Sequence, residues 1–152
     1  MAIGEICSRL VVFARPNESV RSAAGLMREH HVGSLVVVEE SGRGRIPVGI
    51  LTDRDIAVGV VALGLDPDAT LVEAVMSPEV IVEREETGVA ETVALMRQKG
   101  LRRLPIVDMA GSLVGVVAAD DLLGLLAEEM GALADIVARE QRRESAQRTA
   151  LP

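Results

Sequence analysis

Aromatic residues are nearly absent from this chain of 152 residues. It has no Trp and no Tyr, and Phe13 is its one aromatic side chain. Proteins that bind single-stranded nucleic acid commonly stack the bases on aromatic side chains, which this chain hardly supplies. The net charge of −7 also opposes a phosphate backbone, because affinity for it comes from clustered Lys and Arg. We therefore expect no nucleic-acid partner.

Cysteine and long apolar runs are scarce as well. Cys7 is the only cysteine, which excludes an internal disulfide and a cysteine-based zinc site. The apolar stretches are far shorter than the roughly twenty residues that a membrane-spanning helix needs. The N-terminal segment MAIGEICSRL includes an acidic residue and no long apolar run, so it does not resemble a secretory signal. These features predict a cytoplasmic protein that does not enter membranes.

Motifs of catalysis are also missing. The sequence has no Walker-type phosphate loop and no GxGxxG fingerprint, and its spacing suggests no Cys–His or Ser–His–Asp arrangement. His30 and His31 are the only histidines. Neighbours on a helix point about 100° apart, which disfavours a shared metal ion. We expect neither enzymatic activity nor a metal site.

What the sequence does contain is an internal repeat. A shift of 69 positions aligns similar residues of the two halves without gaps, pairing Ser8, Val11, Arg15 and Val20 with Ser77, Val80, Arg84 and Val89. The offset later falls to 66, because the turn in the first half is longer, and Gly49 then aligns with Gly115. Cys7 aligns with Met76, so we expect it in an apolar slot, buried and unreactive.

Both copies have the same order of predicted elements. In each, a strand-like run precedes a helix whose apolar residues recur at i, i+3, i+4 and i+7. Two strands joined by a glycine-containing hairpin follow, and then a second helix. In the first copy these elements are at residues 11–13, from Val20, 35–38, 48–51 and from Asp53. In the second copy they are at residues 80–82, from Val89, 104–107, 113–117 and from Asp120. The pattern predicts an α+β fold made of two βαββα units.

The segment after Leu126 lies outside the repeat. Its apolar residues form one helical stripe, made of Met130, Leu133, Ile136 and Val137. Such a stripe predicts a helical extension that continues the last helix or packs on a partner. From Gln141 onward the segment is polar, and we expect it to be frayed.

The two βαββα units, each ending in Gly-hydrophobic-hydrophobic-(Thr/Ala)-x-x-Asp, resemble a tandem pair of CBS domains, also called a Bateman module. The resemblance covers residues 3–125 and includes GILTDRDI, GLDPDATLVEAVMS and LVGVVAADDLL. It implies two CBS units packed with pseudo-twofold symmetry, at residues 1–65 and 66–127, followed by a C-terminal helix and polar tail at 128–152. It also implies a homodimer. Because the chain has no room for an effector domain, we expect a stand-alone regulatory module that acts on a separate effector protein.

Many members of this family bind adenine nucleotides in the clefts between their units. The resemblance therefore implies AMP, ADP or ATP as a regulatory ligand, with no required cofactor. Two alternatives stay open. One is an interaction module without a ligand, whose dimer surface is its function, and the other is a sensor of another adenosyl ligand, such as S-adenosylmethionine or NAD.

The polar residues after the third strand allow two interpretations. Thr52-x-x-Asp55 fits a capping box, which would satisfy free N–H groups at the start of a helix. In the functional interpretation, the Asp55 carboxylate accepts hydrogen bonds from ribose hydroxyls and Thr52 contacts a phosphate. The second copy keeps the acid as Asp121 but has Ala118 in place of the threonine. The acid thus remains where the capping hydroxyl is lost, which favours a ligand role, unless Asp120 caps this helix instead.

A basic pair precedes the second strand of the second copy. Family members often carry a basic residue that contacts phosphate just before the hydrophobic-Pro of this strand, where Arg102 and Arg103 precede Leu104 and Pro105. The alternative is a solvated pair that balances nearby acids. The first copy has uncharged residues at the aligned positions, so the copies look complementary rather than equivalent. The predicted binding residues are Thr52, Asp55, Arg102, Arg103, Pro105 and Asp121.

Overall fold

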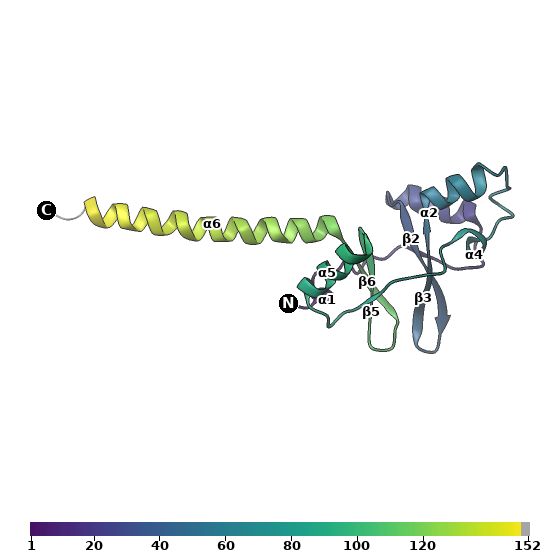
Figure 1. Ribbon diagram of the computed structural model, residues 1–152, viewed down its shortest axis with the longest axis horizontal. Helices are drawn as coiled ribbons and strands as arrows, with labels where there is room; N and C mark the ends of the chain where they lie inside the picture. Colours follow the sequence, from purple (N-terminus) through teal and green to yellow (C-terminus); the bar gives the residue numbers. More distant parts are fainter. Residues whose placement is uncertain (150–152) are drawn as a thin grey trace. The chain divides into compact units, whose positions relative to one another are not determined.

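The computed structural model describes residues 1–149, and the chain divides into two compact units at Val117/Ala118. The first unit contains two three-stranded sheets with their helices, as Figure 1 shows. The second is essentially one helix, α6 (Ala119–Thr149). The α+β class, the two repeated units and the C-terminal helical extension are thereby confirmed.

The two copies have matching elements. The first copy contains α1 (Ile3–Ile6), β1 (Phe13–Ala14), α2 (Val20–His30), β2 (Ser34–Ser41), β3 (Gly44–Thr52), α3 (Asp53–Ile56) and the π-helical turn η1 (Ala57–Val61). The second contains α4 (Val72–Val75), β4 (Glu83–Arg84), α5 (Val89–Lys99), β5 (Arg103–Val107) and β6 (Leu113–Ala118). The sheet orders are β1-β2-β3 and β4-β5-β6. The β1–β2 and β4–β5 pairs are parallel, and β2–β3 is an antiparallel hairpin.

Local features mark the start of helix α2 and the ends of helices α2 and α5. The Ser22 N–H donates to Ser19 Oγ over 3.1 Å, which caps the start of α2. Gly100 ends α5 in the left-handed conformation, with φ of 65°. His31 ends α2 at the aligned position with φ of 54°, a conformation that is costly for a side chain with a Cβ. Both copies thus end this helix with a residue in the left-handed conformation, but only the second copy has glycine there.

The segment leading into each copy pairs with the third strand of the other copy. Ser77 and Ile50 exchange two backbone hydrogen bonds of 2.9 and 3.0 Å. Ser8 and Val116 exchange two of the same lengths. These pairs are related by the repeat offsets of 69 and 66 found in the sequence. The reciprocal pairing explains why β1 and β4 begin later than predicted, because the residues before them cross from one sheet to the other.

Two repeated glycines make this crossing possible. A Cβ on Gly49 would lie 2.7 Å from Ser77 O and 2.6 Å from Met76 Sδ. A Cβ on Gly115 would lie 2.9 Å from Ser8 O and 2.5 Å from Cys7 Sγ. At both positions these distances are too short for any residue except glycine, so packing requires the glycine of the repeated motif.

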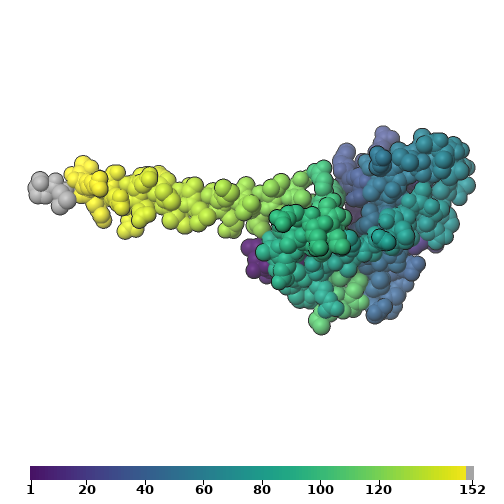
Figure 2. Space-filling model, viewed as in Figure 1, coloured from purple at the N-terminus to yellow at the C-terminus, as the bar shows by residue number. Residues whose placement is uncertain are grey.

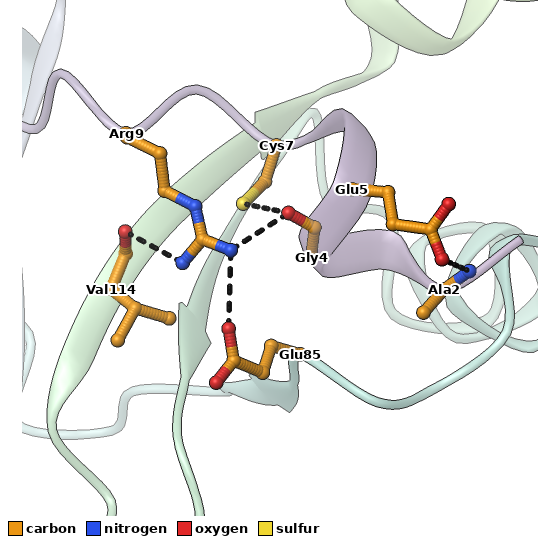
Figure 3. A network of polar contacts seen from close by, with 7 residues as sticks. All are labelled: Ala2, Gly4, Glu5, Cys7, Arg9, Glu85 and Val114. Atoms are coloured by element: carbon orange, nitrogen blue, oxygen red, sulfur yellow. Dashed lines mark hydrogen bonds and ion pairs between the residues drawn. The ribbon is translucent and has the colours of Figure 1, made fainter.

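Cys7 is buried beneath β6, as predicted. Burial raises the pKa of its thiol, which lowers the thiolate fraction and hence its reactivity. Arg9 holds the same N-terminal segment against the second copy: its Nη2 donates to Gly4 O over 2.8 Å and to Glu85 Oε2 over 3.1 Å (Figure 3). A longer contact of 3.4 Å joins Nη1 to Val114 O. Figure 1 accordingly places the N-terminus beside α5.

Each sheet has an apolar layer beneath its helices. Around the first sheet, the buried cluster is made of Ala14, Ala23, Met27, Leu35, Val37, Leu51 and, from α4 of the second copy, Val72. In the second, the fully or nearly fully buried residues are Thr92, Met96, Leu104, Ile106, Val107 and Val117. The Thr92 hydroxyl donates to Gly88 O over 3.0 Å, so burial of this polar group leaves no unmade hydrogen bond.

The C-terminal helix is longer than predicted. Residues from Gln141 onward were expected to be frayed; this is wrong for residues 141–149, because α6 continues to Thr149, and residues 150–152 lie outside the described residues. Most residues of the segment 141–149 are Arg, Glu, Gln or Ala, which are good helix formers. Within residues 1–149, no helix is long and apolar enough to cross a bilayer.

Candidate ligand-binding site

The capping box at the end of β3 is fully formed. The Thr52 N–H donates to Asp55 Oδ2 over 2.9 Å, and the Asp55 N–H donates to Thr52 Oγ1 over 3.1 Å. Both residues are half-buried. The structural interpretation of this motif is therefore confirmed, and the cap fixes the orientation of the Asp55 carboxylate.

The cap does not use up the carboxylate. An ionised Asp has about four acceptor positions on its two oxygens. Among residues 1–149, the Thr52 N–H is the one hydrogen-bond donor to the Asp55 side chain. The remaining positions can accept from two hydroxyl groups of a ligand. Capping and ligand binding are thus compatible, because the hydrogen bond that closes the helix also aims the acceptor.

The second copy retains half of this box. The Ala118 N–H donates to Asp121 Oδ2 over 3.2 Å, in the first turn of α6. Alanine has no hydroxyl to return the bond, so one of the two cap interactions is missing. Asp121 is exposed, whereas Asp55 is half-buried. The sequence suggested that the cap is lost here, but the acid still binds the N-cap N–H.

The start of β2 lies beside the end of β3. Ser34 is the register partner of Thr52, and the Asp53 N–H donates to Gly33 O over 2.9 Å. The Asp53 carboxylate accepts from the Arg54 N–H over 2.8 Å, so its oxygen Oδ1 serves the local backbone. A Cβ on Gly33 would lie 3.1 Å from Asp53 Oδ2. The structure thus joins the strand start and the capping box into one edge that has little steric bulk.

The basic pair occupies the aligned strand start of the second copy. Arg103 is the first residue of β5 and is exposed, as is Arg102. Within residues 1–149, the Arg103 guanidinium makes no hydrogen bond or ion pair, and none joins it to Thr52 or Asp55. Pro105 is buried within β5. The structure therefore brings Thr52 and Asp55 into contact and leaves Arg103 open to solvent.

A groove that the sequence did not indicate lies at the other end of the hairpin. It has a volume of about 580 Å³ and is lined in part by Arg9, Glu40, Arg45 and Ser112. Ser34 and Thr52 mark one end of the β2–β3 hairpin, and Ser41 and Gly44 mark the end that borders the groove. Only spatial proximity assembles these residues, so no sequence motif could have found them. The groove is separate from the capping-box edge.

The chain belongs to the CBS domain family. The family model of the CBS domain matches it twice, at residues 3–61 and 65–128. The two matched segments contain the capping-box residues and the basic pair described above. The chain thus contains one pair of CBS domains.

Several curated proteins are similar to this chain. An uncharacterized protein of Methanopyrus kandleri is 42% identical over 123 residues, which cover 81% of this chain and 61% of that protein. The CBS domain-containing protein YhcV of Bacillus subtilis is 42% identical over 112 residues, or 74% of this chain and 76% of that protein. This chain therefore matches under two thirds of the length of the first relative and about three quarters of the second.

Solved structures share the fold. Hypoxic Response Protein I, with two coordinated zinc ions, is 28% identical with a TM-score of 0.70, covering 81% of this chain and 97% of that one. The CBS domain pair of protein MJ0100, in complex with 5′-methylthioadenosine and S-adenosyl-L-methionine, is 27% identical with a TM-score of 0.71, covering 85% and 98%. Within residues 1–149 of this chain, no group of three or more His, Cys, Asp or Glu side chains is placed to hold a metal ion.

Proposed function

We propose that this protein is a cytoplasmic, non-catalytic regulatory module that binds an adenine nucleotide, with Asp55 as the ribose-binding residue. The observation that carries the proposal is the closed capping box, which orients a half-buried carboxylate and leaves most of its acceptor positions unused. Family membership supports it, as does the similarity to a CBS pair solved with two adenosyl compounds. We retain 1–65, 66–127 and 128–152 as the division into two CBS units and a tail.

The ribose end of the proposed site follows from hydrogen-bond chemistry. Two vicinal hydroxyls of a ribose are donors at a spacing that one carboxylate can accept, as an acidic residue does in dinucleotide sites. Asp55 meets this requirement, and the neighbouring Thr52 and Ser34 add polar groups at the same edge. Asp121 is the corresponding acceptor in the second copy, and its exposure predicts a weaker contribution there.

The phosphate end requires positive charge. The chain carries a net charge of −7, which repels a nucleotide at long range. Affinity for phosphate therefore needs nearby cations, and Arg103 has an exposed guanidinium without a protein partner among residues 1–149. Arg102 adds a second charge at the same strand start. Pro105 would act through the shape of the strand, because it is buried.

The regulatory output would come from the pairing of the two copies. Ligand binding at strand ends would shift the equilibrium between two arrangements of the copies, to the extent that the ligand binds one of them more tightly. A separate effector protein would respond to this change. The apolar residues Val58, Val61 and Leu65 are exposed on the first copy and support a homodimer as the responding assembly.

A second candidate ligand class is favoured by one observation. The MJ0100 pair was solved with S-adenosyl-L-methionine and 5′-methylthioadenosine, which carry ribose but no phosphate. Adenine nucleotides and these adenosyl compounds share the ribose, which Asp55 can bind in either case. They differ at the 5′ position, where only a nucleotide carries the phosphate that Arg102 and Arg103 could bind. Comparing ligands that differ at the 5′ position therefore separates them.

The experiment is isothermal titration of the full-length protein with adenosine, AMP, ATP and S-adenosylmethionine, with GTP as the control for the base. We expect AMP or ATP to bind more tightly than the others. Asp55→Asn keeps an oxygen for the cap but removes the charge, and should weaken binding roughly ten- to hundredfold, since a hydrogen bond to a charged group contributes about 1.5–3 kcal/mol. Equal affinity of wild type and Asp55→Asn for AMP, or no binding by any adenosyl compound at millimolar concentration, would refute the proposal.

A further inference from the structure

The groove at the turn ends of the two hairpins is built from both copies. The turn of the β2–β3 hairpin supplies Ser41, Gly44 and Arg45, and the turn before β6 supplies Ser112. The Arg45 N–H donates to Ser112 Oγ over 3.1 Å, which joins the two turns. Figure 2 shows these turns next to each other at the lower edge of the first unit, blue beside green. The volume of about 580 Å³ is within the range of pockets that hold small molecules.

Arg45 lines this groove with its hydrogen-bond donors unused. Its guanidinium carbon lies 4.6 Å from the centre of the Phe13 ring, a cation–π contact that does not occupy an N–H group. Within residues 1–149, the Arg45 guanidinium makes no hydrogen bond or ion pair. The residue is exposed, so a ligand can reach it. The single aromatic residue of the chain thus holds an arginine whose N–H donors remain available.

Two serine hydroxyls of the groove are available as donors as well. Ser112 Oγ accepts from the Arg45 N–H, and Ser41 Oγ accepts from the Arg43 N–H over 3.1 Å. Across the described part of the chain, neither hydroxyl donates its own proton to another protein group. Arg9 adds a second guanidinium, which uses Nη1 and Nη2 in the contacts of Figure 3 but not Nε. The groove is therefore rich in unused donors.

The other charges of the groove are offset by ion pairs. Glu40 is the one acidic residue of its lining within residues 1–149, and it is the register partner of Arg45. The Glu40 carboxylate accepts from Arg15 Nη2, and this hydrogen bond lowers the pKa of Glu40, so the pair is ionised at neutral pH. Arg9 is offset in the same way by Glu85. The positive charge of Arg45 is left without an ion pair, and an anion would offset it.

The charged groove belongs to one copy only. Under the repeat alignment, Pro78 stands at the position of Arg9 and Gly111 at that of Arg45. The offset falls from 69 to 66 because the turn of the first copy is longer, and Arg45 lies within that turn. The second copy forms the same fold without either arginine. The fold therefore does not require these two cations, whereas an anionic ligand does.

We propose that this groove binds the phosphate group of a small molecule, with Arg45 as the principal ligand-binding residue and Ser41, Ser112 and Arg9 as further donors. A phosphate group presents three or more acceptor oxygens, and hydrogen bonds from arginine to such oxygens are among the strong ones in proteins. The donors available here exceed what the two oxygens of one carboxylate can use. Because the ligand would contact the turns of both copies, its binding would stabilise their paired arrangement.

The first test locates the ligand by NMR of the full-length protein. Inorganic phosphate is titrated at constant ionic strength, with sodium chloride as the balancing salt, and proton–nitrogen correlation spectra are recorded. The backbone signals of Arg45 and Ser112 and the Nε–H signal of Arg45 should shift and reach saturation at millimolar phosphate. Shifts confined to Arg102 and Arg103, or no saturable shift, would overturn the proposal. Tighter binding of succinate than of phosphate at the groove would contradict the assignment to phosphate.

The second test changes the charge of the groove in both directions. Arg45→Gln should weaken phosphate binding about tenfold, because it removes a charged donor. Arg43→Gln is the matched control: it removes the same charge from the same turn, but this residue does not line the groove, and the affinity should stay close to that of the wild type. Glu40→Gln should strengthen binding, because it removes a negative charge and releases Arg15. Unchanged affinity in Arg45→Gln, or weaker binding by Glu40→Gln, would refute the site.

The groove and the proposed nucleotide site can be tested separately. Arg45→Gln should leave the affinity for AMP unchanged, because Thr52 and Asp55 lie at the other end of the hairpin. Asp55→Asn should leave the response of the groove signals to phosphate unchanged. Equal losses of AMP and phosphate binding in Arg45→Gln would show one shared site and overturn a separate phosphate site. Absence of AMP binding by the wild type, with the groove signals still responding to phosphate, would leave the groove proposal supported.

Discussion

The two CBS copies share the residues that pack and differ in the residues that face solvent. Gly49 and Gly115 both admit a crossing strand, and Ser8 and Ser77 form the same pair of backbone hydrogen bonds. At the strand ends, by contrast, the first copy has a complete capping box and small uncharged neighbours. The second has half a box and two arginines. Duplication thus fixed one architecture while the two candidate half-sites became chemically different.

The largest effect should come from filling the shared glycine positions. Gly49→Ala and Gly115→Ala each place a methyl group within 3 Å of a backbone oxygen, and should lower the free energy of unfolding by about 1–3 kcal/mol. Urea unfolding measures this, and the two losses should be similar. Gly42→Ala is the control, because nothing lies within 4 Å of its added Cβ. A large loss for one glycine only would contradict the equivalence of the crossings.

Exchanging the acids tests whether the two ribose positions are equivalent. Asp55→Asn should weaken nucleotide binding roughly ten- to hundredfold, and Asp121→Asn should weaken it less, because Asp121 is exposed and hydrogen bonds there compete with water. Titration calorimetry provides both affinities and the number of sites. A larger loss for Asp121→Asn would reverse the assignment of the stronger half-site to the first copy.

The arginines should determine selectivity rather than overall stability. Arg102→Gln/Arg103→Gln should reduce the preference for AMP over adenosine by roughly tenfold, about 1.4 kcal/mol, and leave adenosine binding nearly unchanged. The preference of the wild type should also shrink as salt concentration rises, because salt screens exposed charges. If adenosine and AMP bind the wild type equally at low salt, the pair is not a phosphate site.

Transferring the capping hydroxyl between the copies should change stability with opposite signs. Thr52→Ala removes the acceptor of the Asp55 N–H and should cost about 1 kcal/mol. Ala118→Thr supplies the missing acceptor in the second copy and should add up to about 1 kcal/mol. Thermal unfolding of the two single variants and the combined one tests this. Loss of stability in Ala118→Thr would mean that the second copy cannot accommodate a complete box.

The smallest expected effect concerns the helix stops. His31→Gly removes the cost of holding a residue with a Cβ in the left-handed conformation, but it also makes the unfolded chain more flexible. The free energy of unfolding should therefore rise by only about 0.5 kcal/mol. Gly100→His should lose a similar amount. Differential scanning calorimetry of both variants resolves such changes, and a gain in both would indicate that backbone conformation does not control these positions.

The repeat in the sequence was sufficient to predict the fold, because apolar periodicity and glycine-containing turns are local signals. Ser19 at the start of α2 and Gly100 at the end of α5 are local signals of the same kind. The pairing of Ser8 with Val116 was not predictable, since two residues about a hundred positions apart leave no local pattern. At the site, the contact of Thr52 with Asp55 follows from a motif. The Ala118 N–H bond to Asp121 does not, because backbone donors are the same in every residue.

The reciprocal strand pairing also has a consequence for how the chain folds. Residues near Ser8 leave the ribosome early but find their partner only after Val116 has been made, so the second sheet closes last. Pairing over such a separation is slow to form. A chain divided between the copies would leave one edge of β3 and one edge of β6 without its partner, and such edges seek strands to bind. Two fragments produced by cutting the chain near Asp66 should therefore bind each other and restore the folded pair.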